Sequence, residues 1–145
     1  MRSDDRARAI RSFNRFYTKQ IGLLNKGYLD SPFSLTEMRV LYELAHRDAP
    51  AAAELSRDLD LDAGYLSRML LRFEKRGWLR RDRIDGDARR SRLSLTRLGL
   101  AKFRPFEAQA NREIRAMLDK VPEADQQRLI EAMQTIQELL ASASK

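Results

Sequence analysis

The stretch DAGYLSRMLLRFEKRGWLRRDRIDGDARRSRLSL, residues 62–95, decides the fold of this chain. Its first half has helical spacing, and Asp62 is a residue type that often caps a helix N-terminus. Gly77 supplies the residue at which such a helix stops. The expected buried stripe consists of Leu66, Met69 or Leu70, and Phe73. The side opposite this stripe is rich in hydrogen-bond donors.

The second half of the stretch predicts a β-hairpin. WLRRDRI (78–84) and RLSLT (92–96) are short segments typical of strands. Asp85, Gly86 and Asp87 lie between them and are turn-forming residue types. A hairpin that directly follows a capped basic helix is the arrangement of a winged helix.

The residues upstream complete a helix-turn-helix. Ser34 followed by Glu37 is a capping box that opens a helix ending near His46. Pro50 then breaks the chain, and AAAELSRDL (51–59) predicts a short helix. This short helix and the capped one after it form the helix-turn-helix pair.

Long amphipathic helices are expected at both ends of the chain. Residues 4–28 carry apolar side chains at spacings of three and four, and two further helices are expected between residue 97 and the C-terminus, with a kink just before Pro105. The fold class is therefore mainly α with a small β-hairpin: one domain, 1–145, whose winged helix-turn-helix core (34–96) is flanked by helices in 1–33 and 97–145. Their surplus apolar faces predict a homodimer, with packing onto the chain's own core as the alternative.

Positive charge is concentrated in the winged-helix segment. The chain has a formal net charge of +7. Residues 62–97 hold eleven lysines and arginines and five acidic residues, a net charge of +6, so the other 109 residues carry only +1. Such a concentration favours a phosphate backbone as partner, with an ordinary solvated basic face as the alternative and an anionic membrane as a distant third.

Several classes of function are disfavoured. With no cysteine and one histidine, the chain lacks the residues of a thiolate metal site, a disulfide or a histidine-based catalytic set. We expect no metal, no cofactor and no enzymatic activity. No apolar run is long enough for a membrane span or a secretory signal, so we expect a cytoplasmic protein.

The donors on the capped helix predict how DNA is read. The N-terminal half of a recognition helix faces base edges, and an arginine there can bind guanine through two hydrogen bonds. We assign this role to Arg68, with Arg72 on phosphate one turn later. Tyr65 either joins this surface or only packs at the helix edge. We expect Glu74 to pair with an arginine of the following strand, and Trp78 to lie in the core beneath the hairpin.

Two segments carry a resemblance to a known family. LSRMLLRFEKRGWLRR and DARRSRLSLTRLG resemble the recognition helix, the Asp-x-Arg wing and the Leu-Thr-x-x-Gly motif of the MarR family of winged-helix transcription regulators. Trp78 is larger than the residue common at its position, and the IDG turn before Asp87 is short. The short turn leaves open whether the inserting arginine shifts by one residue.

The resemblance implies a homodimer on a double-stranded, pseudo-palindromic DNA operator. We expect a repressor, with an activator as the alternative. It implies that Asp87 braces the wing and that Arg89 enters the minor groove, with Arg90 and Arg92 on phosphate. The complete predicted DNA-binding set is Asp62, Gly64, Tyr65, Ser67, Arg68, Arg72, Arg89, Arg90 and Arg92.

The resemblance also implies a pocket for a small-molecule effector between the end helices and the winged helix. Candidate lining residues are Phe13, Tyr17, Tyr28, Phe33, Met38 and Tyr42, with ordinary core packing as the alternative. Two other functions stay open: a basic module that binds nucleic acid or protein without sequence preference, and the regulatory half of a protein with an acetyltransferase domain, since the opening region resembles that subgroup.

Overall fold

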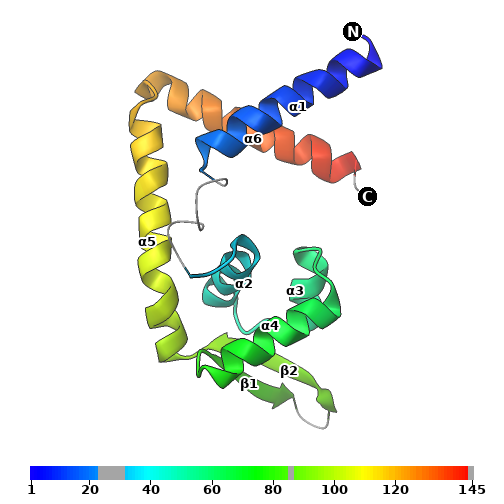
Figure 1. Ribbon diagram of the computed structural model, residues 1–145, viewed down its shortest axis with the longest axis vertical. Helices are drawn as coiled ribbons and strands as arrows, with labels where there is room; N and C mark the ends of the chain where they lie inside the picture. Colours follow the sequence, from blue (N-terminus) through cyan, green and yellow to red (C-terminus); the bar gives the residue numbers. More distant parts are fainter. Residues whose placement is uncertain (23–31, 85–86, 144–145) are drawn as a thin grey trace. The chain divides into compact units, whose positions relative to one another are not determined.

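The computed structural model describes residues 1–22, 32–84 and 87–143, without the side chains of residues 87–90. The chain divides into two compact units, Met1–Glu107 and Ala108–Lys145. The elements follow one another as α1 (Ser3–Gln20), α2 (Leu35–His46), α3 (Ala52–Asp58), α4 (Ala63–Lys75), β1 (Leu79–Ile84), β2 (Asp87–Leu95), α5 (Arg97–Asp119) and α6 (Glu123–Ala143) (Figure 1). The predicted fold class, mainly helical with one hairpin, is confirmed.

The starts of α2 and α4 are set by side-chain caps. The Glu37 N–H donates to Ser34 Oγ over 3.1 Å, and the Ser34 N–H donates back to the Glu37 carboxylate over 3.0 Å, which confirms the capping box. The Asp62 carboxylate accepts from the Tyr65 N–H over 2.8 Å and caps α4 as predicted. Each cap satisfies a backbone donor that a helix N-terminus leaves free.

Thr96 joins α4, the hairpin and α5. Its hydroxyl donates to the Gly77 carbonyl over 2.5 Å and accepts from the Gly99 N–H over 3.1 Å. Its own N–H donates to the Trp78 carbonyl over 2.9 Å. The start of α5 is thus fixed to the residues that follow α4.

The hairpin is a two-stranded antiparallel sheet with an irregularity near its tip. Leu79 pairs with Leu95 at the base, and the register shifts between Arg83 and Ile84, where Ile84 pairs with Asp87. The expected second strand, 92–96, was too short: β2 begins at Asp87. Asp87 was expected in the turn, but its pairing with Ile84 makes it the first residue of β2.

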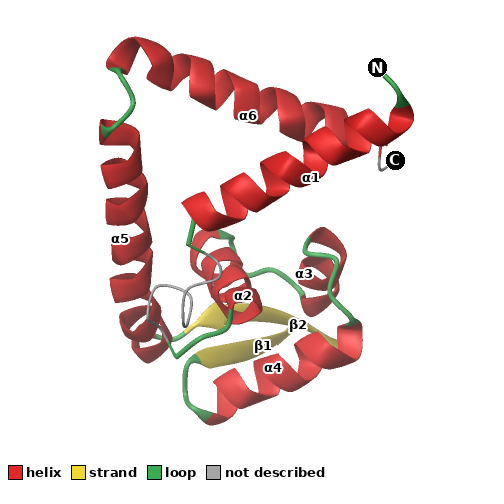
Figure 2. Ribbon diagram, turned by 45° about the horizontal axis from the view of Figure 1, so that its top comes forward, coloured by secondary structure: helices red, strands yellow, loops and turns green. Residues whose placement is uncertain are grey.

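The core of the first unit lies where α2, α3 and α4 meet the hairpin (Figure 2). A backbone hydrogen bond of 2.9 Å from the Leu93 N–H to the Pro50 carbonyl ties β2 to the loop before α3. Trp78 packs against this core as predicted, with its ring 5.4 Å from Phe33 and 5.7 Å from Phe73. The buried residues are Phe33, Met38, Val40, Leu41, Leu44, Leu55, Leu66, Met69, Leu70, Phe73, Leu79, Leu93 and Phe103.

The end helices differ from the sequence prediction in one respect. The first helix was expected to run to residue 28, but α1 ends at Gln20 and Gly22 has φ 73°. A glycine at positive φ is a common helix stop. Pro105 lies inside α5, which continues past it to Asp119.

One polar contact joins α2 to α5. His46, the last residue of α2, has its Nε2 2.6 Å from Glu107 Oε2. Both residues belong to the first unit, at the end of that unit's share of α5. The contact and the Thr96 bonds hold residues 97–107 to the winged helix at two places.

Candidate nucleic-acid interface

The outward side of α4 is a polar surface backed by a packed core. Gly64, Ser67, Arg68 and Arg72 are exposed, and they lie on one side because helical residues three and four apart are neighbours. The opposite side is the buried stripe Leu66, Met69, Leu70 and Phe73. Packing of that stripe fixes the rotation of α4, and so presents the four predicted positions to solvent.

The N-terminus of α4 combines a carboxylate, a glycine and an arginine. A Cβ on Gly64 would lie 3.2 Å from the capping oxygen of Asp62 and 3.4 Å from Arg68 Nη1. Arg68 therefore extends toward the start of the helix, the end that meets base edges in helix-turn-helix proteins. Tyr65 is 38% exposed, which leaves its hydroxyl-bearing ring partly accessible beside this group.

Two residues on the same surface were missed from the sequence. Leu71 is 46% exposed and Lys75 is exposed, and both continue the row of Ser67, Arg68 and Arg72. Their signal was present in the helical spacing, but Leu71 was not assigned to either side. An exposed apolar side chain on a groove-facing helix can contact a thymine methyl group.

The arginines near the hairpin fall into paired and unpaired groups. Arg81 Nε lies 2.7 Å from the Glu74 carboxylate, which confirms the expected pairing of Glu74 with a strand arginine. Arg80 pairs with Asp82 over 3.2 Å. Within the described part of the chain, Arg68, Arg72 and Arg83 make no ion pair. Unpaired cations can bind phosphate without first breaking a contact within the protein.

The wing residues are described only in part. Arg92 Nη1 donates to the Ala49 carbonyl over 3.3 Å, so this arginine contacts the loop before α3 while remaining exposed. Asp87, Arg89 and Arg90 have their backbone in β2, and their side chains lie outside the described residues. Their assigned roles in bracing the wing, entering the minor groove and binding phosphate stay predictions.

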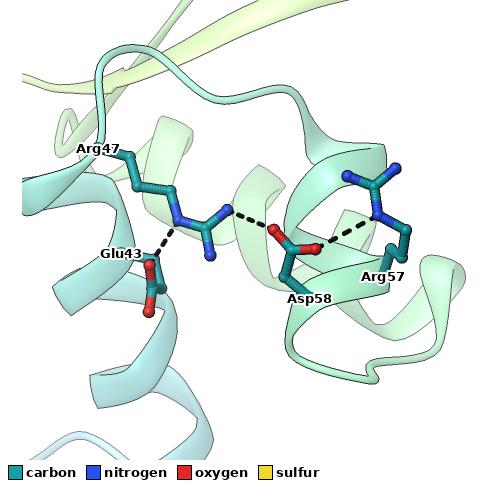
Figure 3. Close-up of polar contacts among 4 residues, drawn as sticks. All are labelled: Glu43, Arg47, Arg57 and Asp58. Atoms are coloured by element: carbon teal, nitrogen blue, oxygen red, sulfur yellow. Dashed lines mark hydrogen bonds and ion pairs between the residues drawn. The ribbon is translucent and has the colours of Figure 1, made fainter. Parts of the chain in front are cut away.

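A four-residue ion network holds α3 against α2. Arg47 contacts Glu43 over 2.5 Å and Asp58 over 2.7 Å, and Arg57 contacts Asp58 over 3.3 Å (Figure 3). The hydrogen bond from Arg47 holds the pKa of Asp58 below its usual value, and the same bond raises the pKa of Arg47. The network helps to position α3, which packs against α4.

The residues predicted to line an effector pocket occupy different environments. Phe33 and Met38 are buried core residues, whereas Tyr42 is 51% exposed and its ring lies 4.4 Å from the His46 ring, tilted by 41°. Phe13 and Tyr17 stack on each other along α1, with ring centroids 5.7 Å apart. Tyr28 lies outside the described residues. These positions leave the predicted pocket untested.

A cavity lies elsewhere in the first unit, between α3, α4 and β1. Its volume is 360 Å³. None of the six residues predicted for the effector pocket lines it. Polar atoms come from Ser56, Arg57, Ser67 and Arg81, and apolar lining comes from Ala52, Ala53, Ala63, Leu66 and Leu70.

Among residues 1–22, 32–84 and 87–143, the structure contains no group of three side chains, drawn from histidine, cysteine, aspartate or glutamate, that could hold a metal ion. Over the same residues, no helix has the length and apolar character to cross a membrane.

The exposed helix α4, the short helix α3 before it and the paired strands after it define a winged helix-turn-helix domain. Residues 33–91 match the model of the MarR family. Regulators of that family bind DNA and control transcription. Among curated proteins, none matches the chain by sequence.

Solved structures share the fold over nearly the whole chain. FabT of Streptococcus pneumoniae, solved with DNA, has a TM-score of 0.69 at 18% identity, covering 97% of this chain and 96% of that one. A mutant of E. coli MarR complexed with operator DNA has a TM-score of 0.67 at 23% identity, covering 87% and 91%. PcaV of Streptomyces coelicolor, solved with its natural ligand, has a TM-score of 0.65 at 19% identity, covering 94% and 92%.

Proposed function

We propose that this protein is a sequence-specific DNA-binding transcriptional regulator that acts as a homodimer on a pseudo-palindromic operator. The observation that carries the proposal is the outward side of α4, where Ser67, Arg68 and Arg72 stand exposed above a packed stripe in a segment that matches the MarR family model. FabT and MarR have been solved with DNA, which supports the same partner here. The protein would act in the cytoplasm, where its DNA is.

We expect affinity and sequence preference to come from two different kinds of contact with DNA. Arg72, Arg83 and the wing arginines supply affinity through phosphate, and each such contact makes binding weaker as salt rises. Arg68 and its neighbours at the start of α4 supply sequence preference through base edges. Repression follows from this design when the operator overlaps a promoter, because the bound dimer occupies the DNA that the polymerase needs.

Dimerisation is supported by apolar side chains that the single chain leaves in solvent. On α1, Ile10 is 61% and Phe16 is 63% exposed. On α6, Ile136 is 41% and Leu139 is 66% exposed. Contiguous exposed apolar surface on a helix usually marks a protein contact, and a two-fold dimer matches the two-fold symmetry of a palindrome.

A small-molecule effector is part of the proposal. The cavity between α3, α4 and β1 has Ser67 of the DNA-facing helix in its lining, together with Arg57 and Arg81. An anionic ligand seated there would contact the recognition helix directly. Its binding would lower DNA affinity by the same factor by which DNA lowers affinity for the ligand.

Selection of binding sites from a pool of random duplexes tests the core of the proposal. The wild-type protein is expected to enrich one palindromic motif and to prefer it to bulk DNA by at least about a thousandfold at physiological salt. Arg68→Ala should relax one base pair in each half-site, at a cost of about 1 to 3 kcal/mol. Arg39→Ala, an exposed arginine on α2, is the matched control.

Two results would contradict this proposal. Recovery of no motif, with a specificity ratio near one, would favour a binding module without sequence preference. A stable monomer in sedimentation at micromolar concentration would contradict the dimer.

A further inference from the structure

The first helix carries a second concentration of positive charge, separate from the winged helix. α1 holds five basic and two acidic residues, a net charge of +3. Four of the basic residues, Arg8, Arg11, Arg15 and Lys19, follow one another at spacings of three, four and four. We call these four residues the α1 basic stripe, and all of them are exposed.

The α1 basic stripe lies opposite the apolar side of the same helix. At about 100° per residue, its four members fall within about 80° of one another, and their centre lies about 170° from the centre of the apolar side. That apolar side contains Ile10, Phe13 and Tyr17. Covering the apolar side with a partner protomer therefore leaves the α1 basic stripe in solvent.

No carboxylate within the described residues neutralises the stripe through an ion pair. Asp4 lies one turn before Arg8 and is not within ion-pair distance of it. Like charges three and four residues apart on a helix repel one another. A polyanion bound along the helix would remove that repulsion.

We infer that the α1 basic stripe binds the phosphate backbone of duplex DNA outside the operator. Eleven residues of helix separate Arg8 from Lys19, a rise of about 16 Å. Duplex DNA presents about ten phosphates over that axial length. Three of the four cations are arginines, whose guanidinium groups match phosphate geometry better than lysine does.

Duplex DNA fits this surface better than a lipid bilayer. A helix that lies on a bilayer must bury its apolar side in the lipid. In the proposed dimer that side is already covered, whereas binding a rod of phosphates uses the basic side alone. The protein would then hold DNA through two surfaces, one that reads sequence and one that does not.

The test replaces the α1 basic stripe and measures two DNA affinities. The variant Arg8→Gln, Arg11→Gln, Arg15→Gln, Lys19→Gln is titrated with a short operator duplex and with a long duplex that lacks the operator. We expect affinity for the long duplex to fall by about tenfold to a hundredfold. In a plot of the logarithm of that affinity against the logarithm of the salt concentration, the magnitude of the slope should decrease by about three. Affinity for the short operator should stay within about twofold, because the stripe lies outside the winged helix.

The matched control removes four exposed cations that form no stripe: Lys102→Gln, Arg115→Gln, Lys120→Gln, Arg128→Gln. Both variants lose the same net charge, so an equal loss of long-duplex affinity would show that only net charge matters and would overturn the inference. An unchanged salt slope for the stripe variant would also overturn it. If the fourfold variant fails to dimerise, Arg11→Gln with Arg15→Gln is expected to give about half the slope change.

The inference rests on the proposed function, because that function makes DNA the partner. The experiments can still contradict the inference and the proposed function separately. Loss of operator preference in the wild type, with a stripe effect on the long duplex, would remove the proposed function and leave the inference standing. Flotation of the wild type with anionic phosphatidylserine vesicles, without a stripe effect on DNA, would assign the stripe to lipid and overturn the inference.

Discussion

Substitution of Gly99 by alanine would test how α5 is attached to the winged helix. A Cβ at Gly99 would lie 2.2 Å from the Trp78 carbonyl oxygen and 3.0 Å from its carbonyl carbon. These are backbone atoms next to β1, so no side-chain rotation relieves the contact. The helix must instead move by about 1 Å, which lengthens the 3.1 Å bond from the Gly99 N–H to Thr96.

The magnitude follows from two opposing effects. Alanine stabilises a helix interior relative to glycine by about 0.8 to 1 kcal/mol. Overpacking of a tight site costs about 1 to 3 kcal/mol, and a backbone contact belongs at the upper end of that range. We therefore expect Gly99→Ala to lower the free energy of unfolding by about 2 kcal/mol.

Urea unfolding at a fixed protein concentration measures this loss, because the apparent stability of a dimer depends on concentration. Gly64→Ala is the control: its new Cβ would meet only side-chain atoms of Asp62 and Arg68, at 3.2 and 3.4 Å. It should leave stability within about 1 kcal/mol of the wild type, with either sign. A Gly99→Ala protein as stable as the wild type would refute the attachment we describe.

Three further predictions concern a loop residue with positive φ, an ion pair and a helix cap. Ala49 has φ 42°, a conformation that side chains disfavour, so Ala49→Gly should raise the free energy of unfolding by about 1 kcal/mol in a urea titration; a loss would contradict the strain. The pKa of Asp58 is lowered by its bond to Arg47, so the stability it contributes is present above the usual carboxyl pKa and is lost as the pH falls through the lower folded value. Asp58→Asn should therefore flatten the acid limb of a plot of thermal midpoint against pH, and a curve parallel to the wild type would refute this. Asp62→Asn keeps the cap on the Tyr65 N–H but removes a negative charge from the DNA-facing end of α4. In a titration at fixed salt concentration, it should therefore tighten binding to non-operator DNA by about threefold to tenfold. Weaker binding would show that the carboxylate itself contacts the DNA.

Features set by neighbouring residues could be predicted from the sequence. The capping box at Ser34, the cap at Asp62 and the buried side of α4 each depend on residue types within one or two helical turns. The outward positions on α4 followed from the same periodicity.

Features set by pairs distant in the sequence could not be predicted. His46 and Glu107 are 61 residues apart, and no local pattern brings them together. The contact of Arg92 with the Ala49 carbonyl spans 43 residues and depends on how β2 meets the loop before α3. The extent of β2 was missed for a related reason, since pairing with β1 decides where that strand begins.

The two attachments of α5 have a mechanical consequence. Thr96 clamps its first turn, and the contact between His46 and Glu107 clamps it again about three turns later. A helix held at two points is stiffest between them, so residues 97–107 are expected to move together with the winged helix even though Pro105, which removes a backbone hydrogen bond, lies among them. A force that acts on this part of α5 would therefore rotate the winged helix as one rigid piece, so the recognition helix would change its orientation and keep its shape.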